Sequence, residues 1–249
     1  MKIKKIISAV AIVQLGLVSA GFAISCDVPN IDGVKWYNES VEKRAIALEV
    51  YNLAKIKIAE QIKKEKLQSG TWGIVLDIDE TTLDNSWLEH DDYKNYQYNP
   101  DKFDKALKEE KSIAIPGAKM LTNFVHKKGG FVSLVTNRTG NDKELIKATE
   151  ENLSEQGIYY DQILFTNKNQ ENHNDKNPRF KAVSTGKYSE GMIYTDKLPA
   201  HDIVAYFGDN IQDFPAMTQE KMKTADDSQF DVFGSKYFIL PNPMYGSWQ

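Results

Sequence analysis

The fold is decided by the stretch Trp72-Gly73-Ile74-Val75-Leu76-Asp77-Ile78-Asp79-Glu80-Thr81. Residues 72–76 carry no charge, and acidic residues follow at once. A short apolar run of this kind is typical of a strand that is buried on both faces of a parallel sheet. We therefore expect a strand whose carboxyl end carries Asp77, and a functional site where the chain leaves the sheet.

The same pattern recurs along the chain. Further short apolar runs predict strands at residues 131–136, 163–165 and 203–209. Apolar residues at helical spacing predict helices at residues 36–66, 118–128 and 143–156. Strands that alternate with helices predict an α/β fold, a Rossmann-like parallel sheet with helices on both faces. Ligands of such sheets bind beyond the carboxyl ends of the strands, so the polar ends should converge at one edge.

Two pairs of aspartates follow the predicted strands. Asp77 and Asp79 are two residues apart, so one carboxylate can attack a phosphorus atom while the other transfers protons. Asp209 and Asp213 form the second pair, and carboxylate oxygens suit Mg²⁺. Repulsion between such close carboxylates favours a bound cation. Taken singly, these acids could also belong to an ordinary acidic turn or to a helix start stabilised by its dipole.

A hydroxyl and an amide side chain end the strand expected at residues 131–136. Thr136 and Asn137 follow its apolar part directly. A hydroxyl with the backbone amides after it suits a non-bridging phosphate oxygen. The alternative is a polar turn in which Thr136 caps a helix.

The chain is expected to divide into an export segment and one domain. Residues 1–25 have a basic start and an apolar centre, typical of a signal peptide, although an uncleaved anchor or a buried helix is the alternative. Residues 26–34 are predicted to be a tether and residues 35–249 the domain. Within it, residues 84–115 interrupt the alternation of strands and helices and should form a small cap over the site.

Cys26 is the only cysteine, which excludes an intramolecular disulfide. Ala23-Ile24-Ser25-Cys26 resembles a bacterial lipobox. This resemblance implies a lipid on Cys26 and an exported domain tethered to a bacterial membrane, at the outer membrane or on the periplasmic face. A free thiol near a cleavage site is the alternative.

The motifs together resemble the haloacid dehalogenase (HAD) superfamily, and within it the class C acid phosphatases, which are bacterial surface lipoproteins. The resemblance is carried by residues 77–85, 134–138, 208–214 and 240–248. It implies hydrolysis of phosphomonoesters through an aspartyl-phosphate on Asp77, with Asp79 as general acid/base. It also implies a Mg²⁺ cofactor bound by Asp77, Asp79, Asp209 and Asp213, with Asp79 using its backbone carbonyl, and phosphate binding by Thr136 and Asn137.

The resemblance further implies a lysine that neutralises the phosphate and the nucleophile. Lys176, in the segment Lys176-Asn177-Pro178-Arg179-Phe180, fits this motif, and Lys181 and Lys187 are rivals in the same window. The segment 184–200 is longer than the corresponding segment in this branch usually is, between the lysine and the strand that ends at Gly208-Asp209. It is expected to add a surface loop.

The substrate is expected to be a small phosphomonoester. Nucleoside 5′-monophosphates are substrates in this branch, so Trp87 and Tyr245 are candidates to stack on a base, with packing in the core or cap as the alternative. The net charge of −4 gives no electrostatic footprint for nucleic acid. Two alternative functions stay open at this point. One is transfer of the phosphoryl group from the same intermediate to an acceptor other than water, and the other is a non-enzymatic role as a surface-binding lipoprotein. The sequence also leaves open an oligomer.

Overall fold

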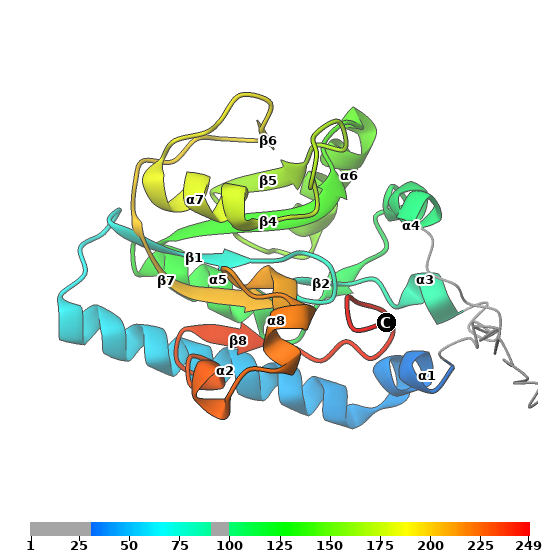
Figure 1. Ribbon diagram of the computed structural model, residues 1–249, viewed down its shortest axis with the longest axis horizontal. Coiled ribbons are helices and arrows are strands. Elements are labelled where there is room, and N and C mark those ends of the chain that lie inside the picture. Colours follow the sequence, from blue (N-terminus) through cyan, green and yellow to red (C-terminus); the bar gives the residue numbers. More distant parts are fainter. Residues whose placement is uncertain (1–30, 91–99) are drawn as a thin grey trace, which may run out of the picture.

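The computed structural model describes residues 31–90 and 100–249. Its centre is a six-stranded sheet in the order β6-β5-β4-β1-β7-β8, with helices on both faces (Figure 1). Neighbouring strands pair in parallel, except that β6 runs antiparallel to β5. The strands are β1 (Trp72–Leu76), β4 (Phe131–Thr139), β5 (Gln162–Thr166), β6 (Ile193–Tyr194), β7 (Asp202–Gly208) and β8 (Tyr237–Ile239). The predicted α/β fold is confirmed.

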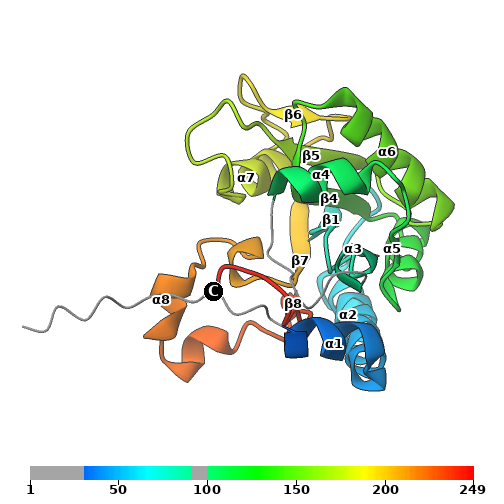
Figure 2. The ribbon, with the colours of Figure 1, turned by 90° about the vertical axis from the view of Figure 1, so that its right-hand side faces the viewer.

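Two layers of helices cover the sheet, which Figure 2 shows nearly edge-on. Ile74 and Leu76 of β1 belong to the core on one face, and Val75 belongs to the core on the other. Both faces of β1 are therefore buried, which explains its continuous apolar run. The first face packs against α2 (Val41–Glu65), α5 (Ala118–Lys127) and α6 (Lys143–Glu155), and the second against α7 (Asn177–Thr185) and α8 (Gln219–Lys223).

The helix predicted at residues 36–66 is in fact two helices, α1 (Ile31–Glu39) and α2. Ser40 separates them with an extended backbone, and its hydroxyl accepts a hydrogen bond from the backbone N–H of Lys43 at 3.2 Å. This is an N-cap, which starts a new helix. Residues 31–34, assigned to the tether, belong instead to α1, because Val34 and Tyr37 bury their side chains in the domain core.

The region expected to be a cap contains several short elements. Its described part includes α3 (Trp87–His90), α4 (Pro100–Leu107) and the antiparallel pair β2 (Leu83–Asp84) and β3 (Ile113–Ala114). Phe103 and Leu107 of α4 pack with Leu145 of α6. The helix α4 therefore lies against the main domain beside the carboxyl edge of the sheet.

Three further details differ from the sequence expectation. The segment 184–200 is more than a loop, because β6 adds an antiparallel edge to β5, and Tyr188 donates a hydrogen bond to Gln162 Oε1 at 2.6 Å. The strand β4 continues past Thr136 to Thr139. The strand β8 and the 3₁₀ helices η2 (Ile211–Asp213) and η3 (Asp227–Phe230) were not predicted. No helix of the described ranges is long and apolar enough to cross a membrane.

Candidate active site

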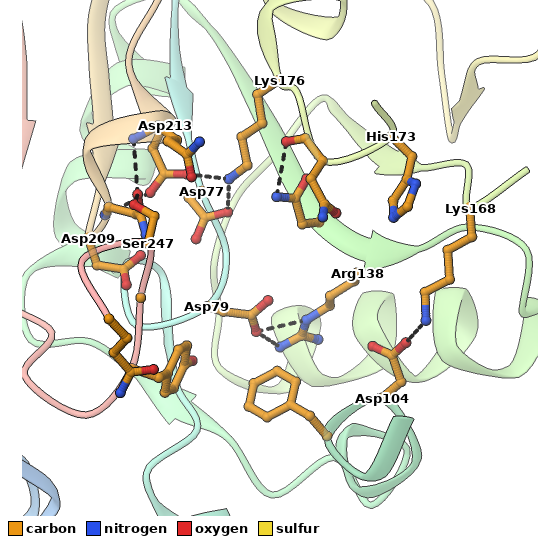
Figure 3. A pocket seen from close by; sticks show the side chains of 18 residues that line it. Asp77, Asp79, Asp104, Arg138, Lys168, His173, Lys176, Asp209, Asp213 and Ser247 are labelled. Carbon is orange, nitrogen blue, oxygen red and sulfur yellow. Dashed lines mark hydrogen bonds and ion pairs between the residues drawn. The ribbon is translucent and has the colours of Figure 1, made fainter. Parts of the chain in front are cut away.

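A cavity of about 430 Å³ opens at the carboxyl edge of the sheet (Figure 3). Four segments distant in sequence supply its walls: the end of β1, the end of β4, the loop before α7, and the turn after β7. The C-terminal segment and α4 close the remaining sides. Its lining includes Asp77, Asp79, Asn137, Arg138, Lys176, Asp209, Asp213 and Tyr245.

Lys176 lies between two carboxylates in this cavity (Figure 3). Its ammonium group donates hydrogen bonds to Asp77 Oδ1 and, at 2.6 Å, to Asp213 Oδ1. The backbone fixes Asp77, because its N–H donates to the Phe207 carbonyl at 3.0 Å and its own carbonyl accepts from the Thr82 hydroxyl at 2.6 Å. The three charged side chains are almost fully buried, so their charges interact with little screening by water.

Asp209 completes a cluster of three carboxylates. One carboxylate oxygen from each of Asp77, Asp209 and Asp213 lies within 4.8 Å of the others. Asp209 is held by the Thr81 hydroxyl at 3.3 Å and the Asn242 amide at 2.8 Å. Asp213 ends the 3₁₀ helix η2, where its Oδ2 accepts from the Asn210 N–H at 2.9 Å in a capping box. The turn after β7 is thus a 3₁₀ turn.

Burial raises the free energy needed to ionise the carboxylates of this cluster. It raises the pKa of Asp77 to about 7, opposed by Lys176 and reinforced by Asp213 and Asp79. Burial, Asp213 and Asp77 also raise the pKa of Asp209 well above its ordinary value. The Lys176 ammonium contacts two of the three carboxylates, so the cluster carries excess negative charge when all three are ionised. Hard oxygen donors and excess negative charge are the properties of a divalent cation site, and the residues fit one.

Asp79 is held from the opposite wall by Arg138, as Figure 3 shows. The Nε and Nη2 atoms of Arg138 donate to Asp79 Oδ1 at 3.0 and 2.7 Å, and Asn85 Nδ2 donates to the same oxygen at 2.8 Å. Arg138 belongs to the motif at residues 134–138, but the sequence prediction gave it no role. Its position directly after Thr136-Asn137 at a strand end was the available signal.

Thr136 and Asn137 are braced by a second buried arginine, Arg179. Its guanidinium donates to the Thr136 carbonyl and, at 2.6 Å, to Asn137 Oδ1. Thr136 is fully buried and is absent from the cavity lining, and its hydroxyl accepts from the Arg138 N–H at 3.0 Å. Asn137 does line the cavity. The role of Arg179 was also missed, although it lies in the quoted motif that contains Lys176.

The two aromatic candidates for base stacking lie in different places. Tyr245 lines the cavity, and its ring packs at a steep angle against that of Phe103, with the two centroids 5.9 Å apart. Trp87 is not among the lining residues, and its indole N–H donates to the Ser112 hydroxyl at 3.3 Å. The geometry therefore favours Tyr245 over Trp87 for contact with a ligand. The lipidation candidate, Cys26, lies outside the described residues.

This combination of fold and carboxylate site defines a class of phosphate-processing enzyme. Residues 6–248 match the family described as HAD superfamily, subfamily IIIB (acid phosphatase), and the chain belongs to it. It is therefore an enzyme, an acid phosphatase that hydrolyses phosphomonoesters.

Solved structures agree with this assignment. The structure of the class C acid phosphatase from Bacillus anthracis is similar at 28% identity, covering 88% of this chain and 86% of that one, with a TM-score of 0.72. The tungstate-bound crystal structure of class C acid phosphatase from Bacillus anthracis matches at 28% identity over the same shares, with a TM-score of 0.70. The predicted resemblance to class C acid phosphatases is confirmed.

Proposed function

We propose that this protein is a Mg²⁺-dependent acid phosphatase that hydrolyses nucleoside 5′-monophosphates through an aspartyl-phosphate on Asp77. The observation that most supports the proposal is the buried contact of Lys176 with both Asp77 and Asp213, next to Asp209. A lysine in this position can compensate the charge of an incoming phosphate and of a carboxylate nucleophile together.

Asp77 and Asp79 divide the covalent and the proton-transfer work. A carboxylate oxygen of Asp77 attacks phosphorus as the bond to the leaving oxygen breaks, and Asp79 gives that oxygen a proton. Asp79, now ionised, then takes a proton from a water molecule that attacks the phosphorus of the acyl phosphate. The phosphorus–oxygen bond to Asp77 breaks, and inorganic phosphate leaves.

The cation is proposed to be held by the carboxylates of Asp77 and Asp209 and by the backbone carbonyl of Asp79. Asp213 is proposed to accept hydrogen bonds from water bound to that cation. When bound, Mg²⁺ supplies positive charge that offsets the negative charge of the phosphate and of the nucleophile. The support for this assignment is the carboxylate cluster, which Lys176 alone among the described residues offsets by direct contact.

The substrate is proposed to lie between the strand ends and the C-terminal segment. Lys176 and Asn137 bind the phosphate, and Tyr245 contacts the base; all three line the cavity. A relative that binds tungstate, a tetrahedral oxyanion as phosphate is, supports an oxyanion site in this fold. Export and a lipid on Cys26, which would tether the domain to a bacterial membrane, are proposed from the sequence alone.

The test is phosphate release from nucleoside 5′-monophosphates with Mg²⁺, compared with release in the presence of a chelator. Asp77→Asn is expected to abolish turnover, and Asp79→Asn to lower it by about 10² or more. Asp202→Asn is the matched control, because Asp202 is exposed at the opposite end of β7. Full activity in Asp77→Asn would overturn the mechanism. Activity on simple phosphomonoesters but not on nucleotides would overturn only the substrate assignment.

A further inference from the structure

One wall of the active-site cavity carries basic side chains that the proposed mechanism does not use. Lys168 and His173, which we call the basic wall, both line the cavity. Figure 3 shows them on the side of the cavity away from Asp209 and Asp213. In the proposed function Lys176 already compensates the charge of the reacting phosphate. The basic wall is therefore left over when the substrate carries a single phosphate.

The backbone around His173 is held in place, while its ring stays available to a ligand. The His173 carbonyl accepts hydrogen bonds from the Thr166 hydroxyl and, at 3.4 Å, from Arg179 Nη2. The next carbonyl, that of Asn174, accepts from Asn137 Nδ2 at 3.3 Å. Among the residues that the structure describes, none forms a hydrogen bond or an ion pair with the His173 imidazole. A ligand in the cavity can accept a hydrogen bond from this ring.

Lys168 is held by a partner that an anion can replace. Its ammonium group donates to Asp104 Oδ2 of α4 at 2.8 Å and lies 3.7 Å from Asp101 Oδ1. The Lys168 side chain is 38% exposed, and an ion pair in contact with water is weak enough to exchange. Burial raises the pKa of Asp104, so this carboxylate gives up its charge more readily than an exposed one. The ammonium group can therefore turn from Asp104 to a doubly charged phosphate.

We propose that the basic wall binds a second phosphate group of the substrate, so that the enzyme prefers nucleoside 3′,5′-bisphosphates to nucleoside 5′-monophosphates. The inference rests on the proposed function, which places the reacting 5′-phosphate at Lys176 and the base at Tyr245. The sugar then lies between them, beside Phe103, whose ring packs against that of Tyr245. Asp104 follows Phe103 in α4, so its partner Lys168 lies within reach of a group on the sugar.

The second phosphate is bound at the basic wall but is not cleaved there. The proposed nucleophile, Asp77, contacts Lys176 on the other side of the cavity, next to the other carboxylates of the proposed cation site (Figure 3). The basic wall offers an ammonium group and an imidazole, which bind phosphate through charge-assisted hydrogen bonds. The 5′-phosphate is therefore transferred to water, as in the proposed function. The products are inorganic phosphate and a nucleoside 3′-monophosphate.

The first test is equilibrium binding, measured by calorimetry with Mg²⁺ on the Asp77→Asn variant, which should not turn over either nucleotide. We expect the 3′,5′-bisphosphate to bind about tenfold more tightly than the 5′-monophosphate. Adding Lys168→Gln should reduce this ratio of dissociation constants to about two or less. Lys105→Gln is the matched control, because Lys105 is exposed on the same helix as Asp104 and does not line the cavity. It should keep the full ratio.

The second test separates phosphate binding from a purely structural ion pair. Asp104→Asn removes the same ion pair as Lys168→Gln but keeps the ammonium group. It should therefore preserve the ratio or increase it, whereas His173→Ala should lower it by about threefold. If the ion pair only ties α4 to the loop before α7, Asp104→Asn and Lys168→Gln should weaken the binding of both nucleotides to the same extent.

Four results would overturn the proposal. They are that equal weakening, equal affinity of the Asp77→Asn protein for the two nucleotides, the same loss of ratio in Lys105→Gln as in Lys168→Gln, and release of the 3′-phosphate before the 5′-phosphate by the wild-type enzyme. Failure of the proposed function looks different. A wild-type protein that is active on other phosphomonoesters but binds neither nucleotide would overturn the nucleotide assignment, and turnover by Asp77→Asn would overturn the mechanism.

Discussion

Arg138 and Asp79 are joined through a single oxygen. The Nε and Nη2 atoms of the guanidinium, and the Asn85 amide as well, donate to Oδ1 of Asp79. Arg138 itself is buried and anchored on the Thr149 hydroxyl at 3.1 Å. Three donors on one oxygen fix the carboxylate, so in the proposed mechanism Asp79 Oδ2 is the oxygen that exchanges a proton with the leaving group.

Arg138→Lys should therefore lower kcat by about 10 to 10², because a lysine keeps the charge but not the planar fork that orients Asp79. KM should change little, since this residue positions Asp79 rather than the substrate. Steady-state kinetics with a nucleoside monophosphate measure both constants. Thr149→Val removes the anchor of Arg138, together with a hydrogen bond to the Leu145 carbonyl, and should cost less activity. A rise in KM with unchanged kcat would instead give Arg138 a substrate-binding role.

Lys176→Met should abolish measurable turnover and destabilise the metal-free protein by about 3–5 kcal/mol, because Asp77 and Asp213 would lose their buried counter-charge. Added Mg²⁺ should recover part of the stability but not the activity. Denaturant unfolding with and without the metal measures the first effect. Lys181→Met is the control, since Lys181 is exposed on α7 and should behave as wild type. Equal losses in both variants would contradict the role of Lys176.

The sequence correctly predicts those parts of the fold that are determined by the local pattern of residues. The strands β1, β4, β5 and β7 are buried on both faces or nearly so, and their apolar runs report that directly. The strands β6 and β8 have only two and three residues, too few for a periodic signal, and tertiary pairing decides them. The predicted helix is interrupted at Ser40, because the Ser40 hydroxyl caps the start of a new helix although the apolar residues continue at helical spacing.

The site divides in the same way. Asp77 and Asp79 lie in one motif, so their proximity follows from the chain itself. The Arg138–Asp79 contact spans 59 residues and depends on how β1 and β4 pair, which no local pattern contains. The motif favoured Lys176, but the lysine-rich window left Lys181 and Lys187 as rivals. The structure distinguishes them because only Lys176 is buried, while Lys181 and Lys187 face solvent.

The metal-free protein should lose stability as the pH rises from about 4 to about 7. The pKa of Asp77 is about 7 in the folded protein and 3.8 ordinarily, so between these values the folded state binds the extra proton and rising pH favours unfolding. Bound Mg²⁺ requires the ionised carboxylates, so its stabilising effect should grow over the same range. Thermal unfolding at a pH of about 5 and about 7.5, with Mg²⁺ or a chelator, measures both trends.

The Asp77→Asn variant isolates this contribution from the other titrating groups. Without metal, its melting temperature relative to wild type should rise with pH, because the amide has no charge to bury. The gain from Mg²⁺ should shrink at the same time. If wild type and variant kept a constant difference across this range, Asp77 would not be the group whose titration limits stability.

Tyr245→Ala should raise KM for nucleoside 5′-monophosphates by about tenfold, the effect of losing one base–aromatic contact, while KM for a phosphomonoester without a base should change less. Tyr245→Phe keeps the ring and should resemble wild type. Trp87→Ala should leave KM for both substrates nearly unchanged, because Trp87 does not line the cavity. Parallel kinetics on the two substrates provide the comparison. A selective loss of nucleotide binding in Trp87→Ala, with Tyr245→Ala unaffected, would indicate that the base binds beside α3 instead.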